Sequence, residues 1–442
     1  MWSCSLGSRH HRNSIGQKMC CLAAYISLTI VLCVMGGAEG GGATPITALT
    51  GPPECSQYNE LFHQIWSDFA ALAAHGPITK ENVTDVWNLA RKWSGWEYYF
   101  VELAIVEGKL FFRGGQRALG PWLHATLKLI ALALHKHGRW VPDVYFVLSV
   151  LDEPYLERGT RSPLPLLAFM TTRGHWDIPV PSHAFFESSG GISSGDVKQD
   201  FQMWEKESWQ AALAEKYPWD GRSERAFFRG HDWDSSNTFV ELLQTRPRES
   251  CIDPSDASRS FGYRRWYTDL SAPGAALAEI LDVNLTGAPS FVLEKYPGRK
   301  FAPPTSLPEH ARHKYLLHLD GTAASNRLIK LMMLGSVVLK QDSVYEEYFY
   351  RNLQPYQHFL PFARDRCSTA NLTDALAWLR SHDTEARKIA QAGQRYARRL
   401  LSTGAATCYW QRVLAVYGAL QAFDPRLVIR TREFHEYHSK HG

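Results

Sequence analysis

Apolar and polar positions follow two different periods along this chain, which indicates a succession of helices and strands. The period is helical from Tyr58 to about Ala74 and from Thr84 to Val106, and about Pro121–Lys136 predicts a further helix. The run VYFVLSV at 144–150 is apolar at almost every position and rich in β-type residues. It therefore predicts a strand buried on both faces of a parallel sheet.

The second half of the chain continues this alternation. A loop rich in Pro, Gly and Ser at 182–195 precedes a helix predicted over about 197–216. Strands and helices alternate from Ala226 to Leu339, and 370–423 is almost wholly helical. This order predicts an α/β protein made of two halves with a cleft between them.

The segment Lys314–Asp342 has the pattern strand, tight turn, helix, strand. Tyr315–Leu319 is a short β-type run that ends at Asp320-Gly321, and four small residues follow, Thr322, Ala323, Ala324 and Ser325. A helix is predicted from there to about Leu334, where Gly335 ends it, and Val337–Leu339 begins the next strand.

The turn of this segment has the chemistry of an anion site. Small residues let a ligand approach the backbone, and the first helical turn offers unpaired N–H groups, the positive end of the helix dipole and Arg327. An anionic nucleotide is the expected ligand. The alternative is an ordinary βαβ crossover with a solvated arginine, because such glycine-containing turns are common.

Length and charge limit the class of protein. The 442 residues suit two domains, and 45% hydrophobic residues suffice for two cores. A formal net charge of +4 without a long Lys/Arg block gives no indication of nucleic-acid binding.

The first 38 residues resemble a targeting segment. Arg9, Arg12 and Lys18 precede an apolar run over 19–35, followed by small residues to Ala38. We expect a signal anchor or a cleaved signal peptide, a Gly/Pro-rich stalk over 39–55, and a location in the secretory lumen, in the ER or Golgi. Three N-x-T sequons predict N-glycosylation at Asn82, Asn284 and Asn371.

Four cysteines lie beyond the targeting segment, Cys55, Cys251, Cys367 and Cys408. An even number in an oxidising compartment predicts disulfides, with three possible connectivities. Their wide spacing does not fit a zinc site.

Asp152 follows the 144–150 strand by two residues. Ligands bind at the carboxyl ends of strands in open α/β sheets, so a carboxylate there is a candidate general base. The alternative is that Asp152, two residues before Pro154, caps a turn.

The run FFRG at 227–230 places Arg229 and Gly230 in a second strand-end site, where a guanidinium can hold a diphosphate. Its alternative is a surface arginine paired with Glu224 or Asp232.

Asp232-Trp233-Asp234 has the form of a metal-binding D-x-D, but Asp234 can equally cap a helix. We predict no metal ion. The sequence contains neither a G-x-S-x-G elbow nor an H-E-x-x-H pair, so a serine hydrolase or zinc enzyme is not supported.

Taken together, these stretches resemble glycosyltransferase family 90, the Rumi-like protein O-glucosyltransferase and capsule-associated xylosyltransferase group. The resemblance covers about Phe111–Leu420. It rests on FFRGG at 111–115, VPDVYFVLSVLDEP at 141–154, DIPVPSHAFFE at 177–187, FFRG at 227–230, the run 313–339 and TCYW at 407–410.

The resemblance implies a GT-B fold, with two Rossmann-like domains that face a cleft. The acceptor-side domain is expected over 56–220 and the UDP-sugar-binding domain over 221–405. The remaining 406–442 is expected to form a helix that crosses back to the first domain, and a tail.

The same resemblance implies an inverting, metal-independent transfer of glucose or xylose from a UDP-sugar to a hydroxyl group. It makes Asp152 the base, Arg229 a donor-binding residue, and Thr322–Arg327 the donor turn, including Asn326. Gly230, Gly321, Ser223 and His231 are further donor-site candidates.

The resemblance also pairs Cys408 with Cys55, which leaves Cys251–Cys367 as the second disulfide. Two departures concern the acceptor side. Ser188–Gly195 replaces an apolar, Pro- and aromatic-containing segment, and His135–Trp140 stands in place of a Cys-flanked loop.

Protein Ser/Thr or glycan acceptors are the expected partners, together with the membrane if the N-terminal segment is retained. One alternative is a transferase that acts on polysaccharide or glycolipid. Another is a catalytically silent protein that binds UDP-sugar or glycan.

Overall fold

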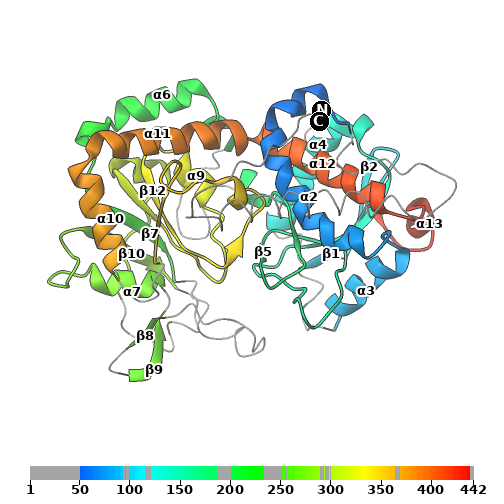
Figure 1. The fold of residues 1–442 in the computed structure, drawn as a ribbon, viewed down its shortest axis with the longest axis horizontal. Coiled ribbons are helices and arrows are strands. Elements are labelled where there is room, and N and C mark those ends of the chain that lie inside the picture. Colours follow the sequence, from blue (N-terminus) through cyan, green and yellow to red (C-terminus); the bar gives the residue numbers. More distant parts are fainter. Residues whose placement is uncertain are drawn as a thin grey trace, which may run out of the picture.

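The computed structural model describes residues 50–92, 99–114, 121–186, 201–232, 251–253, 256–261, 263–288, 300–363 and 369–438, with the single residues 95, 293 and 298. Two main β-sheets lie side by side, each accompanied by helices (Figure 1). The chain has a mixed α/β fold with parallel strands in both sheets.

The first sheet combines antiparallel and parallel pairs. In spatial order its strands are β15 (His435–Glu436), β2 (Lys109–Arg113), β1 (Phe100–Val106), β3 (Val144–Ser149), β4 (Leu166–Ala168) and β6 (Ile178–Pro179). Pairing is antiparallel from β15 to β3 and parallel from β3 to β6. The buried strand predicted at 144–150 is therefore confirmed as β3.

One predicted helix is wrong over half of its length. The helix expected over Thr84–Val106 ends at Ala90, as α3 (Lys80–Ala90), and Phe100–Val106 forms β1. Every residue of β1 is buried, and the strand pairs with β2 on one edge and β3 on the other. A strand without an exposed face lacks the alternation that would have distinguished it from a helix.

The second sheet is parallel throughout. In spatial order its strands are β10 (Leu281–Gly287), β7 (Ala226–His231), β11 (Tyr315–His318), β12 (Val337–Gln341) and β14 (Leu360–Phe362). The strands predicted on both sides of the 320–327 turn are thus β11 and β12. Gly335 precedes β12 with φ +65°, a left-handed conformation, whereas the helix predicted to run to Leu334 already ends at Met332.

Two small antiparallel pairs complete the strands, β13 (Tyr345–Glu346) with β5 (Thr171–Thr172) and β8 (Cys251–Asp253) with β9 (Asp256–Phe261). The α-helices accompanying the first sheet are α2 (Asn59–Ala74), α3, α4 (Pro121–His137), α12 (Thr403–Leu420) and the short α13 (Arg426–Ile429). Those accompanying the second are α7 (Tyr263–Leu270), α9 (Leu328–Met332), α10 (Ala370–Ser381) and α11 (Asp383–Leu400).

The helix predicted over about 197–216 is interrupted. Phe201–Trp204 forms α5 and Glu207–Lys216 forms α6. Gln394 of α11 donates a hydrogen bond to Gln210 of α6, and Figure 1 shows α6 beside α11. The domain boundary predicted at residue 220 would place α6 in the first domain, but this helix lies beside the helices of the second sheet.

The 3₁₀ helices are η2 (Pro53–Tyr58), η4 (Gly138–Trp140), η5 (His183–Phe185), η6 (Trp219–Gly221), η7 (Pro308–Arg312) and η8 (Tyr350–Asn352).

Helix α12 returns the chain to the first sheet, where it packs against α2, α4 and β3. Trp410 is fully buried in α12, and its indole N–H donates to the main-chain oxygen of Pro181 at 3.1 Å. A Cβ added to Gly418 would lie 2.3 Å from Cγ of Pro142. Glycine therefore allows α12 to approach the segment that leads into β3.

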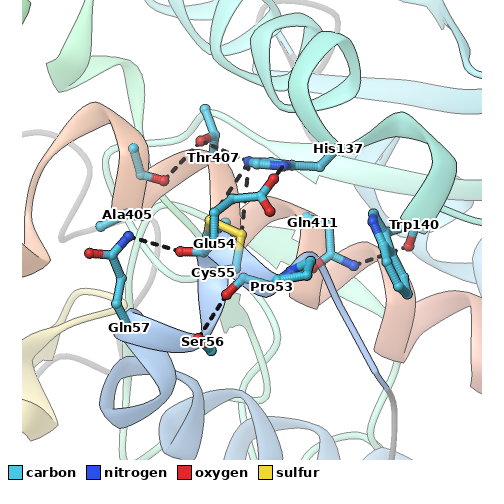
Figure 2. Close-up of a disulfide and its surroundings, with 12 residues drawn as sticks. Pro53, Glu54, Cys55, Ser56, Gln57, His137, Trp140, Ala405, Thr407 and Gln411 are labelled. Carbon is cyan, nitrogen blue, oxygen red and sulfur yellow. Dashed lines mark hydrogen bonds and ion pairs between the residues drawn. A yellow bond between two sulfur atoms is a disulfide. The ribbon is translucent and has the colours of Figure 1, made fainter.

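A disulfide joins Cys55 of η2 to Cys408 of α12, which confirms the pairing implied by the family resemblance. Figure 2 shows His137 beside the two sulfur atoms, with Nε2 3.8 Å from Cys55 Sγ and 3.6 Å from Cys408 Sγ. Burial lowers the pKa of His137, while Glu54, 3.2 Å from Nδ1, partly opposes that shift. Because the sulfur atoms are bonded to each other, neither is a thiolate available to a metal ion.

Several sequence-based expectations concern residues outside the described ranges. They include the targeting segment 1–38, Cys367, Asp234 and the departure at Ser188–Gly195. The Cys251–Cys367 pair remains a prediction. Among the residues that are described, none of the helices has the length and apolar character needed to cross a bilayer.

Removing the disulfide tests how strongly α12 is anchored to the N-terminal segment. The bond closes a loop of sequence separation 353. We expect the double substitution Cys55→Ala/Cys408→Ala to lower the free energy of unfolding by about 2–5 kcal/mol. Guanidinium unfolding followed by tryptophan fluorescence measures the change, with the unsubstituted chain under the same non-reducing conditions as the comparison. An unchanged midpoint in the variant would show that the bond contributes nothing.

Candidate active site

The loops at the carboxyl ends of strands from the two sheets touch one another. Asn326, in the turn after β11, donates from Nδ2 to Nε2 of His183 at 2.8 Å. His183 lies in η5, after β6 of the first sheet. Its ring stacks on that of Trp122, with the ring centroids 4.9 Å apart. The β13–β5 pair makes a second link, with Tyr345 opposite Thr172. Ligands of α/β proteins bind at such strand ends, so this junction is the candidate site.

The turn over 320–327 differs from its prediction in one respect. Helix α9 begins only at Leu328, with Arg327 as its N-cap, and it ends at Met332. Thr322–Ser325 is therefore an irregular loop and does not form the first turn of a helix. The side chains of Ala323 and Ala324 are buried in the core, and the main-chain oxygen of Ser325 lies 2.8 Å from His318 Nε2. A helix dipole at Thr322 is thus excluded as the source of positive potential.

Arg327 lies against the end of β7. Its guanidinium donates to the main-chain oxygen of Arg229 at 2.6 Å. A Cβ on Gly230 would lie 2.8 Å from Arg327 Nη1 and 2.7 Å from the ring of Phe228. Any larger residue at position 230 would displace this guanidinium or the ring.

Arg229 is close to Arg327 through its backbone, but its own guanidinium turns to the neighbouring strand. Nη2 donates to Asp282 Oδ1 at 2.6 Å and Nη1 donates to the main-chain oxygen of Asp282 at 2.9 Å. Neither Glu224 nor Asp232, the partners considered from the sequence, takes this position. Glu224 pairs with Lys314 and Asp232 with Arg265.

Arg264 is a basic residue of the site that the sequence did not reveal. It lies in α7, and its guanidinium donates to the main-chain oxygens of His231 and Leu319, at the ends of β7 and β11. Arg264 and Arg327 both lie near the ring of Phe228, with Cζ at 5.5 Å and 5.9 Å from the ring centroid, respectively. No motif surrounds Arg264 in the sequence, and only the packing of α7 brings it to the strand ends.

Positive charge around the strand ends is apparent in the neighbouring histidines. Burial lowers the pKa of His318 to about 3, and Lys340, Arg264 and Arg327 contribute to the shift. The pKa of His231 is also lowered, by burial and then by the two arginines, while Asp232 opposes it. These histidines are neutral at pH 7, so the arginines carry the positive charge.

Asp152 follows β3 and is half-buried. It belongs to a group of ionisable side chains at the junction, which we call the carboxyl cluster and define as Asp152, Asp320, Glu347 and Lys340. The charges of Asp152, Asp320 and Lys340 all alter the pKa of Glu347. The charge of Asp152 has the smallest of these effects on Glu347, after burial, Tyr350, Lys340 and Asp320.

Asp232 forms a buried ion pair with Arg265. Its carboxylate and the guanidinium of Arg265 are both fully buried, with Oδ2 3.0 Å from Nε and from Nη2. Breaking such a pair would leave an uncompensated buried charge.

Ser223 lies away from the other candidate residues. It precedes β7 and pairs with His313 before β11, at the amino ends of these strands. The extended residues between Ser223 and His231 span on the order of 25 Å.

The three sequons lie in regular elements. Asn82 and Asn371 lie in the first turns of α3 and α10, and Asn284 lies in β10. Glycosylation at these positions remains a prediction.

Comparison with known proteins agrees with the resemblance seen in the sequence. The family model of Glycosyl transferase family 90 matches residues 51–437. Protein O-glucosyltransferase 3 of Homo sapiens is 29% identical over 294 residues, which are 65% of this chain and 49% of that protein. The O-glucosyltransferase rumi homolog of Anopheles gambiae is 25% identical over 378 residues, 85% of this chain and 82% of that protein.

A solved structure, that of Anabaena Alr3699/HepE in complex with UDP-glucose, overlaps with a TM-score of 0.26 at 12% identity. The overlap covers 46% of this chain and 51% of that one, and it is too poor to support a statement on fold or ligand. The chain spans about half the length of several relatives that it matches. Since the family model covers most of the residues, the chain belongs to glycosyl transferase family 90.

Proposed function

We propose that the protein is an inverting glycosyltransferase that moves glucose or xylose from a UDP-sugar to a hydroxyl group. Family membership supports this function, and the relatives named above are called O-glucosyltransferases. The observation that carries the proposal is the junction itself. Asp152 follows β3 of the first sheet, and its charge acts on Glu347 next to β13, whereas Arg327 ends the 320–327 turn, which contacts η5 of the first half through Asn326.

In this proposal, Asp152 accepts the proton of the acceptor hydroxyl while its oxygen attacks the anomeric carbon. UDP leaves from the opposite face of the sugar, and that displacement inverts the anomeric configuration. Arg327 and Arg264 stabilise the negative charge that develops on the diphosphate. Arg229 contributes by holding the end of β7 through Asp282 and by offering its main-chain oxygen to Arg327.

The two sheets with facing loops support a GT-B arrangement, in which the acceptor lies on the side of the first sheet. Metal independence is part of the proposal, because the buried ion pair occupies Asp232 and two arginines are at hand for the diphosphate. A protein hydroxyl is the preferred acceptor, since the relatives act on proteins by name, and a lumenal location in the secretory pathway follows the predicted targeting segment.

Replacing the proposed base separates catalysis from donor binding. Asp152→Asn should lower the turnover of sugar transfer by about 10²–10⁴-fold, the usual contribution of a general base. UDP affinity measured by calorimetry should stay within about twofold, because the amide retains the shape of the carboxylate. Asp85→Asn, at an exposed position of α3, is the control. A variant that still turns over at the control's rate would refute the role of Asp152.

Donor binding is tested by filling the space at Gly230. Gly230→Ala should displace Arg327 or Phe228 at a cost of about 1–3 kcal/mol in the free energy of unfolding, and a displaced Arg327 guanidinium should weaken UDP binding. Gly138→Ala is the matched control, because a Cβ there meets no atom within 4 Å. Equal UDP affinity in the two variants would place the diphosphate elsewhere.

Removal of metal ions tests whether transfer is independent of a metal, as proposed. Transfer from UDP-glucose and UDP-xylose to folded EGF repeats and to oligosaccharides should proceed at the same rate with and without EDTA. A loss of transfer in EDTA would instead assign Asp232 and Asp234 to a metal site. Intact UDP binding without transfer to any acceptor would favour the catalytically silent alternative.

A further inference from the structure

Asp177 holds the backbone of the turn that follows Asp152. The N–H of Tyr155 donates to Oδ1 of Asp177, and the N–H of Leu156 donates to Oδ2, each at 2.8 Å. Asp177 immediately precedes β6, which is separated from β3 by β4 in the first sheet. Both carboxylate oxygens are therefore used to hold the chain three and four residues after Asp152.

Asp177 is buried away from solvent. The residue is 3% exposed. Burial raises the pKa of Asp177 to about 6, and the N–H groups of Leu156 and Tyr155 oppose that shift, so the group is a carboxylate at pH 7. A charge kept out of water costs free energy unless hydrogen bonds offset it, and here the two N–H groups of the turn do so. The carboxylate and the turn therefore hold each other in place.

The other end of the turn is anchored next to β1. The N–H of Val150 donates to the main-chain oxygen of Tyr99 at 2.7 Å. Residues 151–154 alone lie between this anchor and the one at Tyr155. Pro154 fixes its own φ and restricts the residue before it. Asp152 thus lies in a short stretch of chain with little conformational freedom.

The side chain of Tyr155 strengthens the anchor that Asp177 provides. Its hydroxyl donates to the main-chain oxygen of Leu89 in α3 at 2.7 Å. Its ring meets that of Phe100, the first residue of β1, edge to face, with the ring centroids 5.0 Å apart. The chain at position 155 is therefore fixed by contacts with α3, β1 and the residue that precedes β6.

We propose that Asp177 is a positioning residue for the transfer reaction, which holds the backbone of Tyr155 and Leu156 so that the Asp152 carboxylate is directed at the acceptor hydroxyl. The inference rests on the proposed function, because Asp177 acts through Asp152 and touches no substrate. A misplacement of about 1 Å at a reacting group lowers a rate by about 100-fold. A turn this short transmits a displacement of its anchor to Asp152.

Asp177→Asn tests this role without changing the size of the side chain. The amide keeps one accepting oxygen and places an NH₂ group against the other backbone N–H, so one of the two hydrogen bonds is lost. We expect kcat to fall by about 10- to 100-fold, while the Kd for UDP measured by calorimetry stays within about twofold.

Ile105→Val is the control for a loss of stability alone. Ile105 is buried in β1 opposite Val144, the first residue of β3, and so lies at the end of that strand remote from Asp152. Removing one buried methyl group should lower the unfolding temperature and leave kcat unchanged. An equal fall of kcat in the control and in Asp177→Asn would assign Asp177 to stability and overturn the inference.

A double substitution shows whether Asp177 acts through Asp152. Residues that act as a unit have effects that are not additive. Adding Asp177→Asn to Asp152→Asn should therefore lower kcat by less than about a further twofold. If the two effects multiply in full, Asp177 acts independently of Asp152 and the inference is wrong.

Amide hydrogen exchange supplies a measurement that does not depend on activity. In Asp177→Asn, the N–H of Tyr155 or Leu156 loses its acceptor, so mass spectrometry should show exchange about tenfold faster in a peptide spanning residues 150–158. Unchanged exchange would contradict the proposed contact.

These outcomes distinguish the two proposals. If the chain transfers sugar but Asp177→Asn keeps its kcat or its exchange rate, the role of Asp177 is wrong and the proposed function stands. If the unsubstituted chain transfers sugar to no acceptor, the proposed function fails, and the role of Asp177 in transfer fails with it.

Discussion

The contact between Asn326 and His183 fixes the turn after β11 to the loop after β6, and the geometry of the candidate site depends on it. The turn begins at Asp320 in the carboxyl cluster and ends at Arg327, whose guanidinium lies against the end of β7. The turn over 320–327 thus contacts both the loop after β6 of the first sheet and the end of β7 in the second sheet. Any change that separates the two sheets would separate Asp152 from the arginines.

Charge at the junction is divided between the two sides. The arginines lie near Phe228 at the ends of β7 and β11, and they add to the effect of burial in lowering the pKa of His318 and His231. Of the carboxyl groups, Asp152 follows β3 of the first sheet, whereas Asp320 follows β11 of the second, where the charges of Lys340 and Arg264 act on it. A donor with a negative diphosphate and a neutral sugar fits this division, because its diphosphate meets guanidinium groups while its sugar approaches a carboxylate.

Features encoded locally could be predicted from the sequence. Strands β3, β11 and β12 followed from apolar runs, and family resemblance supplied the Cys55–Cys408 bond. Features created by tertiary packing could not be predicted in this way. Strand β1 is buried on both faces and resembled a helix, and the late start of α9 depends on how Ala323 and Ala324 pack.

The same distinction applies within the site. Arg264 lies far from the ends of β7 and β11 in the sequence, and only the arrangement of α7 brings it near them. The direction of the Arg229 side chain could not be predicted from the sequence either, because it depends on a hydrogen bond to Asp282 of a neighbouring strand.

The central claim is that the sugar lies between groups contributed by different sheets. A crystal structure with a non-hydrolysable UDP-sugar analogue tests it most directly. We expect the Asp152 carboxylate and the diphosphate on opposite faces of the anomeric carbon, with guanidinium groups of Arg327 or Arg264 on the phosphate oxygens. A diphosphate bound away from both arginines, or an Asp152 carboxylate out of reach of the acceptor side of the sugar, would contradict the account.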